Sequence, residues 1–398
     1  MTLNELASHV SAEFKKIHGR PPRWLAAAPG RVNVIGEHTD YNDGFVLPMA
    51  IERYAVMAAD GAPDDKKLIR IRDAAPGVEP VTIDLSAPIR PGAPKWGNYP
   101  RGVVAGFLAR GARLGGLDVL LQSTVPLGGG LSSSAALEVC AATLLEAATG
   151  HPIDPVEKAL LCQKAEHEFA GMPCGIMDQF ISVMGRENRL LLLDCRSRKT
   201  DLVPMNDPSV AILIVNTNVK HELTGSEYPM RRKQCEAAAK ILGVPSLRDA
   251  TAEALERARG KMDDVVFRRA RHVIGEIERT VHAAEGVRAS NWPTVGLLMY
   301  ASHRSLRDDY EVSCAELDAV VEIAESIGPR GGVFGCRMTG GGFGGCAVAL
   351  VKSEAAGAIS KTIAGEYKRK TGIEATIFNS RPAPGARILQ NQTGRVWR

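Results

Sequence analysis

One short segment gathers three glycines and three serines, GGGLSSS over 128–134, between an apolar run and a helix-like pattern. Glycines at such a turn let the backbone approach a ligand closely and aim successive N–H groups at it. The start of the following helix adds partial positive charge, and serine hydroxyls can bond phosphate oxygens or a metal ion. A flexible turn with a serine cap would need fewer of these residues, so the segment predicts a phosphate-binding loop.

A second glycine cluster lies between 328 and 345, and it contains a GxGxxG pattern at Gly340, Gly342 and Gly345. A dinucleotide-binding fold would place this pattern after a strand and at the start of a helix. Here the apolar run that follows, 346–351, is typical of a strand, and the chain has no GxxxxGK[ST] motif. We therefore reject a dinucleotide fold and expect a glycine loop that packs against another ligand-binding loop.

Polar side chains follow a predicted strand at 31–35, where Glu37, His38, Asp40 and Asn42 crowd one short loop. Such a mixture of donors and acceptors suits the recognition of a polyol, whose hydroxyls need both. A polar surface turn would look much the same, and this segment alone does not separate the two. A metal site is less favoured, because the loop holds a single histidine.

Two further acidic residues could do chemistry or merely support helices. Asp178 falls in the first turn of an apolar helix-like stretch that follows the helix breakers Pro173 and Gly175. An acid there stabilises a helix N-terminus, but it could also be a base in a cleft. Glu166 fits either an exposed charge or a magnesium ligand. On the residues alone, the structural roles are favoured for both.

The elements that must position these residues follow from hydrophobic periodicity and from helix start and stop signals. The first half is rich in strands and the second half is mostly helical, with a terminal β component, which predicts two α+β domains that meet near residue 200. We expect strands at 31–35, 45–59, 68–72, 81–85, 117–125, 190–193, 210–216, 346–352 and 374–379. We expect helices at 98–114, 132–148, 154–170, 227–242, 249–259, 264–285, 293–305, 311–327 and 354–370, besides an amphipathic N-terminal helix.

Composition narrows the class of protein. The chain has 398 residues, 24% of them charged, and a net charge of +4, which is too small and dispersed to predict nucleic-acid binding. The basic runs 231–233 and 268–271 fit solvated helix faces. The eight cysteines form no CxxC pair, so we expect reduced, buried thiols. Neither a signal peptide nor an apolar run of membrane-spanning length is evident, so we expect a cytoplasmic protein without a membrane anchor.

Three ordered blocks together resemble the GHMP small-molecule kinases, and specifically the galactokinases. GRVNVIGEHTDYNDGFVLPMAI (30–51) is similar to the galactokinase signature, and VPLGGGLSSSAALEV (125–139) to the ATP-phosphate loop of the wider family. CRMTGGGFGGCAVAL (336–350) is similar to its third, glycine-rich motif, and CGIMDQF (174–180) and SEYPMRRKQCE (226–236) also match galactokinases. The first block is specific to galactokinases, whereas the second indicates only a GHMP kinase.

The resemblance implies an α+β fold with a ribosomal-protein-S5-like N-terminal domain (1–205) and an α+β C-terminal domain (206–398), with the active site in the cleft between them. It implies phosphorylation of D-galactose by ATP at the C1 hydroxyl, as the first step of galactose metabolism. ATP and Mg²⁺ are the implied cofactors, and no obligate protein partner is expected. A kinase for another sugar, such as N-acetylgalactosamine, and a non-catalytic sugar sensor are the alternatives. The intact phosphate loop and Asp178 favour catalysis over the sensor.

The resemblance also assigns roles residue by residue. Asp178 would be the base that takes the proton from the sugar's C1 hydroxyl, and Arg31 would stabilise the developing charge. The residues implied to line the sugar site are Arg31, Glu37, His38, Asp40, Gly175, Asp178 and Tyr228, the one aromatic residue among them. Those implied to contact ATP are Trp96, on the adenine side, with Gly128, Gly130, Ser132, Ser133 and Ser134. Ser134 and Glu166 would be the magnesium ligands.

Overall fold

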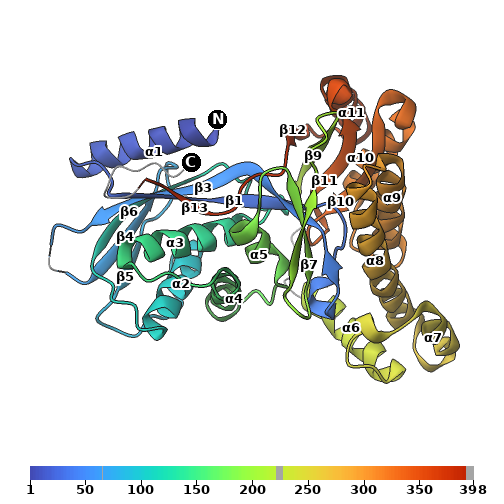
Figure 1. Ribbon diagram of the computed structural model, residues 1–398, viewed down its shortest axis with the longest axis horizontal. Coiled ribbons are helices and arrows are strands. Elements are labelled where there is room, and N and C mark those ends of the chain that lie inside the picture. The colour runs from blue at the N-terminus through green and yellow to red at the C-terminus, as the bar shows by residue number, and fades with distance from the viewer. Residues whose placement is uncertain (65, 221–226, 391–398) are drawn as a thin grey trace.

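The computed structural model describes residues 1–64, 66–220 and 227–390. Its first half is built on a six-stranded sheet in the order β13-β1-β3-β6-β4-β5, which is antiparallel except where β4 runs parallel to β6. Helix α1 lies on one face of this sheet, and α3 lies on the other face with α2, α4 and α5 beside it (Figure 1). The strands are β1 (Trp24–Asn33), β3 (Pro48–Gly61), β4 (Leu68–Asp73), β5 (Val81–Asp84), β6 (Leu117–Ser123) and β13 (Arg387–Gln390). The helices are α1 (Leu3–His18), α2 (Asn98–Ala109), α3 (Ser133–Thr149), α4 (Pro155–Ala165) and α5 (Met177–Met184).

The second half carries an antiparallel four-stranded sheet, β10-β11-β9-β12, against which α9, α10 and α11 pack. A small sheet, β2-β7-β8, lies near the junction of the halves (Figure 1). The strands are β2 (Phe45–Val46), β7 (Arg189–Asp194), β8 (Thr200–Pro204), β9 (Val210–Lys220), β10 (Val333–Thr339), β11 (Gly344–Lys352) and β12 (Thr376–Ser380). The helices are α6 (Glu227–Leu242), α7 (Ala252–Arg257), α8 (Asp264–Arg288), α9 (Trp292–Asp308), α10 (Ala315–Ile327) and α11 (Ala356–Thr371).

Most predicted elements are confirmed, and the α+β class with them. The Asp154 side chain caps α4 by accepting hydrogen bonds from the N–H groups of Val156 and Glu157, as the sequence predicted. Past Ala165 the helix continues as a π-helical turn, Glu166–Ala170, and ends at Gly171 in the left-handed conformation. The pattern at 340–345 runs into β11, which begins at Gly344, and not into a helix, which confirms the rejection of a dinucleotide fold.

Three strands, β8, β10 and β13, were not predicted. β10 carries Gly335 and Arg337 inside an almost wholly buried run, so it shows no alternation of apolar and polar residues. β13 lies near the end of the described chain and pairs with β1 of the first sheet. The division between residues 205 and 206 stays a prediction, and this pairing shows that the last strand belongs to the sheet of the first half.

The expectation that both basic runs form solvated helix faces is wrong for two arginines. Arg231 of α6 and Arg269 of α8 are buried. Arg231 donates to the carbonyl oxygens of Tyr310 and Glu311, and Arg269 forms an ion pair with the Glu311 carboxylate. Both side chains point inward because the turn at 309–311, where Glu311 has a φ of 53°, offers them acceptors. The two guanidinium groups thus hold the segment that carries Tyr310.

The cysteines match expectation, since all eight are free and six are buried. Among the described residues, no helix combines the length and the hydropathy needed to cross a bilayer.

We predict that Gly296→Ala destabilises the protein, because α9 touches β10 through backbone alone at this point. A Cβ on Gly296 would lie 2.0 Å from the carbonyl oxygen of Phe334, so helix and strand would have to separate. The expected cost is about 2–4 kcal/mol of unfolding free energy, measured by denaturant titration. The matched control is Gly365→Ala within α11, where a Cβ would have nothing within 4 Å. That change should stabilise the protein by about 0.5–1 kcal/mol. Equal effects of the two changes would contradict the prediction.

Candidate active site

A hollow of about 170 Å³ at the junction of the two halves brings together all seven residues assigned to the sugar site. Arg31 comes from the end of β1, Asp178 from the first turn of α5, and Tyr228 from α6. The loop after β1 and the segment before α5 supply the others. The lining residues are Arg31, Glu37, His38, Asp40, Gly175, Asp178 and Tyr228, joined by Glu166, Met172, Cys174, Met177, Gly340 and Gly341.

The central feature of this hollow is a two-point ion pair between Arg31 and Asp178. Arg31 Nε lies 2.8 Å from Asp178 Oδ1, and Arg31 Nη2 lies 2.8 Å from Oδ2. Ser132 Oγ donates a further hydrogen bond to Oδ2, and Arg31 Nη1 donates to the carbonyl oxygen of Gly130. Burial by itself would lower the pKa of Arg31, but the carboxylates of Asp178 and Glu37 outweigh it and raise that pKa. The Asp178 carboxylate is therefore held in a fixed orientation beside a permanent cation.

Asp40 faces the segment before α5 so closely that only glycine fits opposite it. A Cβ on Gly175 would lie 1.7 Å from Asp40 Oδ2. Burial, followed by the negative charges of Asp178 and Glu37, raises the pKa of Asp40 from 3.8 to about 7. Near neutral pH this carboxyl group exists in both protonation states, so it can either donate to or accept from a ligand hydroxyl.

The carboxylate of Glu37 is held by four donors from two segments, the end of β1 and residues 337–340. Asn33 Nδ2, Thr339 Oγ1 and the Gly340 N–H lie 3.0, 3.0 and 2.7 Å from its oxygens. Arg337 Nη1 is 3.4 Å from Oε1, and neither side chain of this pair is more than 2% exposed. Arg337 and its neighbours were not predicted from the sequence, because an arginine within an apolar strand carries no periodic signal. Glu37 therefore ties the loop after β1 to the third glycine-rich motif.

His38 adopts a left-handed backbone conformation, with a φ of 64°, and burial lowers the pKa of its imidazole to about 3. Its Nδ1 lies 2.8 Å from the Tyr41 hydroxyl, which in turn lies 2.8 Å from the hydroxyl of Tyr310. The ring of Tyr228 lies 5.7 Å from the imidazole, centroid to centroid. Tyr228 was the one aromatic residue that the sequence assigned to this region. In the structure, Tyr41 and Tyr310 also contact His38 and form the layer behind it. A neutral imidazole suits a neutral, hydroxylated ligand.

The predicted phosphate loop joins β6 to α3 and packs against the second glycine loop, as expected. Gly128 and Gly130 both have a φ of 68°. A Cβ on Gly340 would lie 2.9 Å from the carbonyl oxygen of Gly130, so the two loops touch through backbone. Ser132 precedes α3 with a φ of 58°, and its side chain makes no capping bond to the helix. Its hydroxyl binds Asp178 instead, which leaves the first-turn N–H groups of α3 available for an anion.

The remaining predicted contacts are more dispersed. Glu166, in the π-helical turn, lines the hollow, and its Oε2 accepts a 2.7 Å hydrogen bond from Gln179 Nε2. The pKa of the Glu166 carboxyl is raised overall, first by burial and then by the charge of Asp178, and a hydrogen bond from Ser134 offsets part of this rise. Trp96 lies apart from the hollow, just before α2, and its indole N–H donates to the Glu79 carbonyl oxygen.

The chemistry of this donor set fits Mg²⁺ held partly by phosphate. Ser134 and Glu166 offer a hydroxyl and a carboxylate, both hard oxygen donors that lie in contact. Within the described part of the chain, no group of three or more His, Cys, Asp or Glu side chains is arranged to hold a metal ion. Magnesium commonly takes only one or two protein oxygens beside substrate phosphates and water, so this sparse set is compatible with it.

We predict that Asp40→Asn removes a pH dependence from the stability of the ligand-free protein. Because folding raises the Asp40 pKa from 3.8 to about 7, the native state holds a proton that the unfolded chain releases across this range. Wild-type stability therefore falls as pH rises through this window, and an amide cannot contribute to that fall. The unfolding free energy of the variant minus that of wild type should rise by roughly 1–3 kcal/mol between pH 5 and pH 8.

Urea titrations at a series of pH values measure this difference. Asp84→Asn is the control, because hydrogen bonds from Ser86 lower the Asp84 pKa and move its titration below this window. A flat difference for Asp40→Asn between pH 5 and pH 8 would show that its carboxyl is not perturbed in this way.

Three protein-family models match the chain. The galactokinase galactose-binding signature matches residues 12–60, the GHMP kinase N-terminal domain residues 98–186, and the GHMP kinase C-terminal domain residues 283–368. The galactokinase of Homo sapiens is 48% identical over 391 residues, which cover 97% of each chain. The galactokinase of Bos taurus is 47% identical over the same coverage.

Solved structures agree with these matches. The galactokinase of Lactococcus lactis, solved with galactose, superposes with a TM-score of 0.90 at 32% identity and covers 96% of this chain and 99% of its own. The mevalonate kinase of Methanococcus jannaschii, with a TM-score of 0.65 at 19% identity over 91% of this chain and 99% of its own, shares the fold. Sequence identity over nearly the whole length, together with the matching site signature, shows that the chain belongs to the galactokinase family of the GHMP kinases.

Proposed function

We propose that the protein transfers the γ-phosphoryl group of ATP to the C1 hydroxyl of D-galactose, giving galactose 1-phosphate and ADP. The observation that carries this proposal is the position of Asp178. Its carboxylate lines the sugar-sized hollow, and it is bonded to Ser132 at the start of the phosphate-loop helix. Asp178 therefore contacts both the hollow proposed for the sugar and the loop proposed for ATP, and the two substrates must meet between them. The relative from Lactococcus lactis, which was solved with galactose, supports the choice of sugar.

In this mechanism Asp178 orients the anomeric hydroxyl and accepts its proton as the oxygen attacks phosphorus. The two-point pair with Arg31 fixes which carboxylate oxygens face the sugar, so little reorganisation is needed during the reaction. Arg31 also places a buried positive charge where negative charge develops on the transferring group. Phosphoryl transfer depends mainly on such positioning and electrostatics, which makes this a suitable site for it.

The phosphate loop would hold ATP through backbone N–H groups and hydroxyls. Gly128 and Gly130 give the loop its left-handed turns, and Ser133 and Ser134 open α3, whose first N–H groups face the phosphates in this proposal. Ser134 and Glu166 would hold Mg²⁺, which offsets the charge of the phosphates when bound. Trp96 would lie on the adenine side.

Polar groups of the hollow would recognise the remaining sugar hydroxyls. Asp40, with a pKa of about 7, and the neutral imidazole of His38 can exchange donor and acceptor roles with a polyol. Glu37 holds the loop that presents them, and Tyr228 closes one side. Gly175 matters through its absent side chain, because the Asp40 carboxylate occupies the space where a Cβ would lie. The domain limits, the cytoplasmic location, the use of Mg²⁺ and the absence of an obligate protein partner remain predictions.

A coupled assay of ADP release over a panel of hexoses and amino sugars tests the substrate. We expect turnover with galactose and little with glucose. A preference for N-acetylgalactosamine would show that this amino sugar, and not galactose, is the substrate. Tight galactose binding without ADP release would support a sensor, although the phosphate loop and Asp178 are both intact and in contact.

We predict that Asp178→Asn lowers kcat by about 10²–10⁴-fold, because an amide keeps the shape of the carboxylate but cannot accept the proton. The galactose dissociation constant, measured by calorimetry, should change by less than about tenfold, since one hydrogen-bonding group replaces another. The control is Asp201→Asn in β8, an exposed acid that pairs with Arg288 at the surface. Near-normal turnover by Asp178→Asn would remove Asp178 as the base.

A further inference from the structure

We propose that Glu276 is the positioning residue of the sugar-binding loop, and that Arg279 holds it in place. This inference rests on the proposed function, because it assigns how residues 34–38 are presented to galactose. Glu276 lies on α8 in the second half of the chain, and its side chain is fully buried. It does not line the hollow around Asp178, so it would act through the loop rather than on the substrate.

The direct link is a hydrogen bond to the loop backbone. Glu276 Oε1 accepts from the Gly36 N–H at 3.0 Å and from Ser302 Oγ at 2.6 Å. Gly36 has a φ of 105°, and a Cβ there would lie 2.7 Å from the carbonyl oxygen of Phe45. The Gly36 peptide immediately precedes Glu37, so anchoring its N–H fixes the direction in which the loop leaves β1.

A second link runs through the guanidinium of Arg337, which lies between two buried carboxylates. Arg337 Nη1 is 3.4 Å from Glu37 Oε1, and Nη2 is 3.9 Å from Glu276 Oε1. Arg337 is also fully buried, and its Nε donates to Ser302 Oγ at 3.1 Å. Since ions so deeply buried are stable only when balanced, removing the charge of Glu276 would change the pairing of Arg337 with Glu37.

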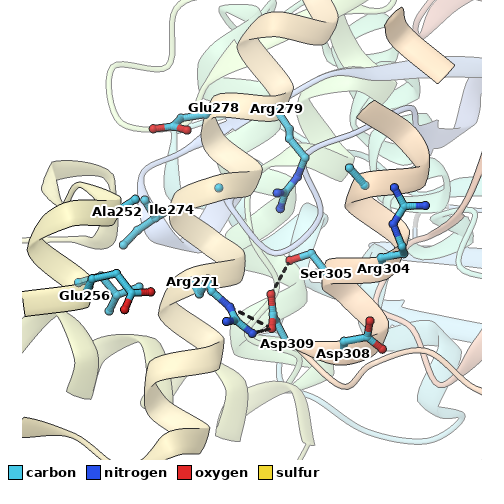
Figure 2. A pocket seen from close by; sticks show the side chains of 13 residues that line it. Ala252, Glu256, Arg271, Ile274, Glu278, Arg279, Arg304, Ser305, Asp308 and Asp309 are labelled. Atoms are coloured by element: carbon cyan, nitrogen blue, oxygen red, sulfur yellow. Dashed lines mark hydrogen bonds and ion pairs between the residues drawn. The ribbon is translucent and has the colours of Figure 1, made fainter. Parts of the chain in front are cut away.

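The outer end of the network is Arg279, one turn further along α8. Arg279 Nε donates to Glu276 Oε2 at 2.8 Å. Burial alone would raise the pKa of Glu276, but Arg279, His272 and Arg337 hold it at about 2. Arg279 lines a separate hollow of about 460 Å³ between α7, α8 and α9, where Figure 2 shows it extending from its helix. Arg279 therefore borders a partly open hollow, so it can be substituted at the edge of the buried network and not inside it.

A parallel contact from the same helix supports this role. His272 Nε2 lies 3.2 Å from the carbonyl oxygen of Glu37, and its Nδ1 lies 3.0 Å from Ser305 Oγ. Successive turns of α8 thus bind the Gly36 N–H through Glu276 and the Glu37 carbonyl through His272. The loop that carries Glu37, His38 and Asp40 is held from behind by one helix, on the side away from the substrate.

The test compares Glu276→Gln and Arg279→Ala with wild type in steady-state kinetics, with galactose binding measured separately by calorimetry. Gln keeps an acceptor for the Gly36 N–H but places a donor against Arg279 and removes the charge that balances Arg337. We expect KM and the dissociation constant for galactose to rise about tenfold for Glu276→Gln and about threefold for Arg279→Ala. KM for ATP and kcat should stay within about twofold of wild type, because neither Glu276 nor Arg279 bonds directly to Asp178 or to the phosphate loop, which the network reaches only through Glu37 and Gly340.

Two variants in the hollow of Figure 2 serve as controls, Glu278→Gln on the exposed side of α8 and Arg304→Gln on α9. Both should leave every kinetic constant unchanged. Unaltered galactose constants in Glu276→Gln and Arg279→Ala, or a parallel rise in the KM for ATP together with a lowered Tm, would overturn the positioning role. If Glu276→Gln does not fold, the milder Arg279→Ala decides the question. A wild-type enzyme without galactose-dependent turnover would instead overturn the proposed function itself.

Discussion

The buried guanidinium of Arg337 is the constraint around which the two halves are arranged. It is fully buried, and its carboxylate neighbours, Glu37 and Glu276, come from opposite halves of the chain. Charges removed from water are costly unless they are paired and hydrogen-bonded, so moving Glu37 away would leave Arg337 paired only with the more distant Glu276 among the described residues. The loop after β1 is therefore tied to α8 and β10. This tie and further contacts between the halves, such as that of His272 with the Glu37 carbonyl oxygen, hold together the two walls of the hollow around Asp178.

A second pairing, between Arg31 and Asp178, gives the hollow its chemistry. Asp178 is bonded at once to a strand residue and to Ser132 at the phosphate loop, and Arg31 reaches the same loop through the Gly130 carbonyl. The contact between Gly130 and Gly340 then joins the phosphate loop to the segment that binds Glu37. Asp178, the glycine-serine loop before α3 and the loop after β1 thus form one connected framework, whose geometry is set before substrates arrive.

Burial also decides the charges that a sugar would meet. The imidazoles of His38 and His272 have pKa values of about 3 and about 4, so both are neutral near pH 7. Asp40, by contrast, has its pKa raised to about 7 by burial and by two neighbouring acids. Among the described residues that line the hollow, Arg31 and Asp178 are the two that form an ion pair with each other. Neutral and switchable groups around that pair suit a polyol, whose hydroxyls demand donors and acceptors rather than net charge.

The sequence by itself determined the local features, which depend on neighbouring residues. The glycine turn before α3, the cap of α4 by Asp154 and the strand after Gly345 were all predicted, because steric freedom and capping are short-range effects. Through resemblance it also indicated seven of the thirteen residues that line the hollow as sugar-site residues. Only the tertiary structure placed Arg337, Glu276 and Arg279, and only it showed that Arg231 and Arg269 turn inward. Their roles depend on partners distant in the chain, since the cost of burying a charge is set by what surrounds it in three dimensions.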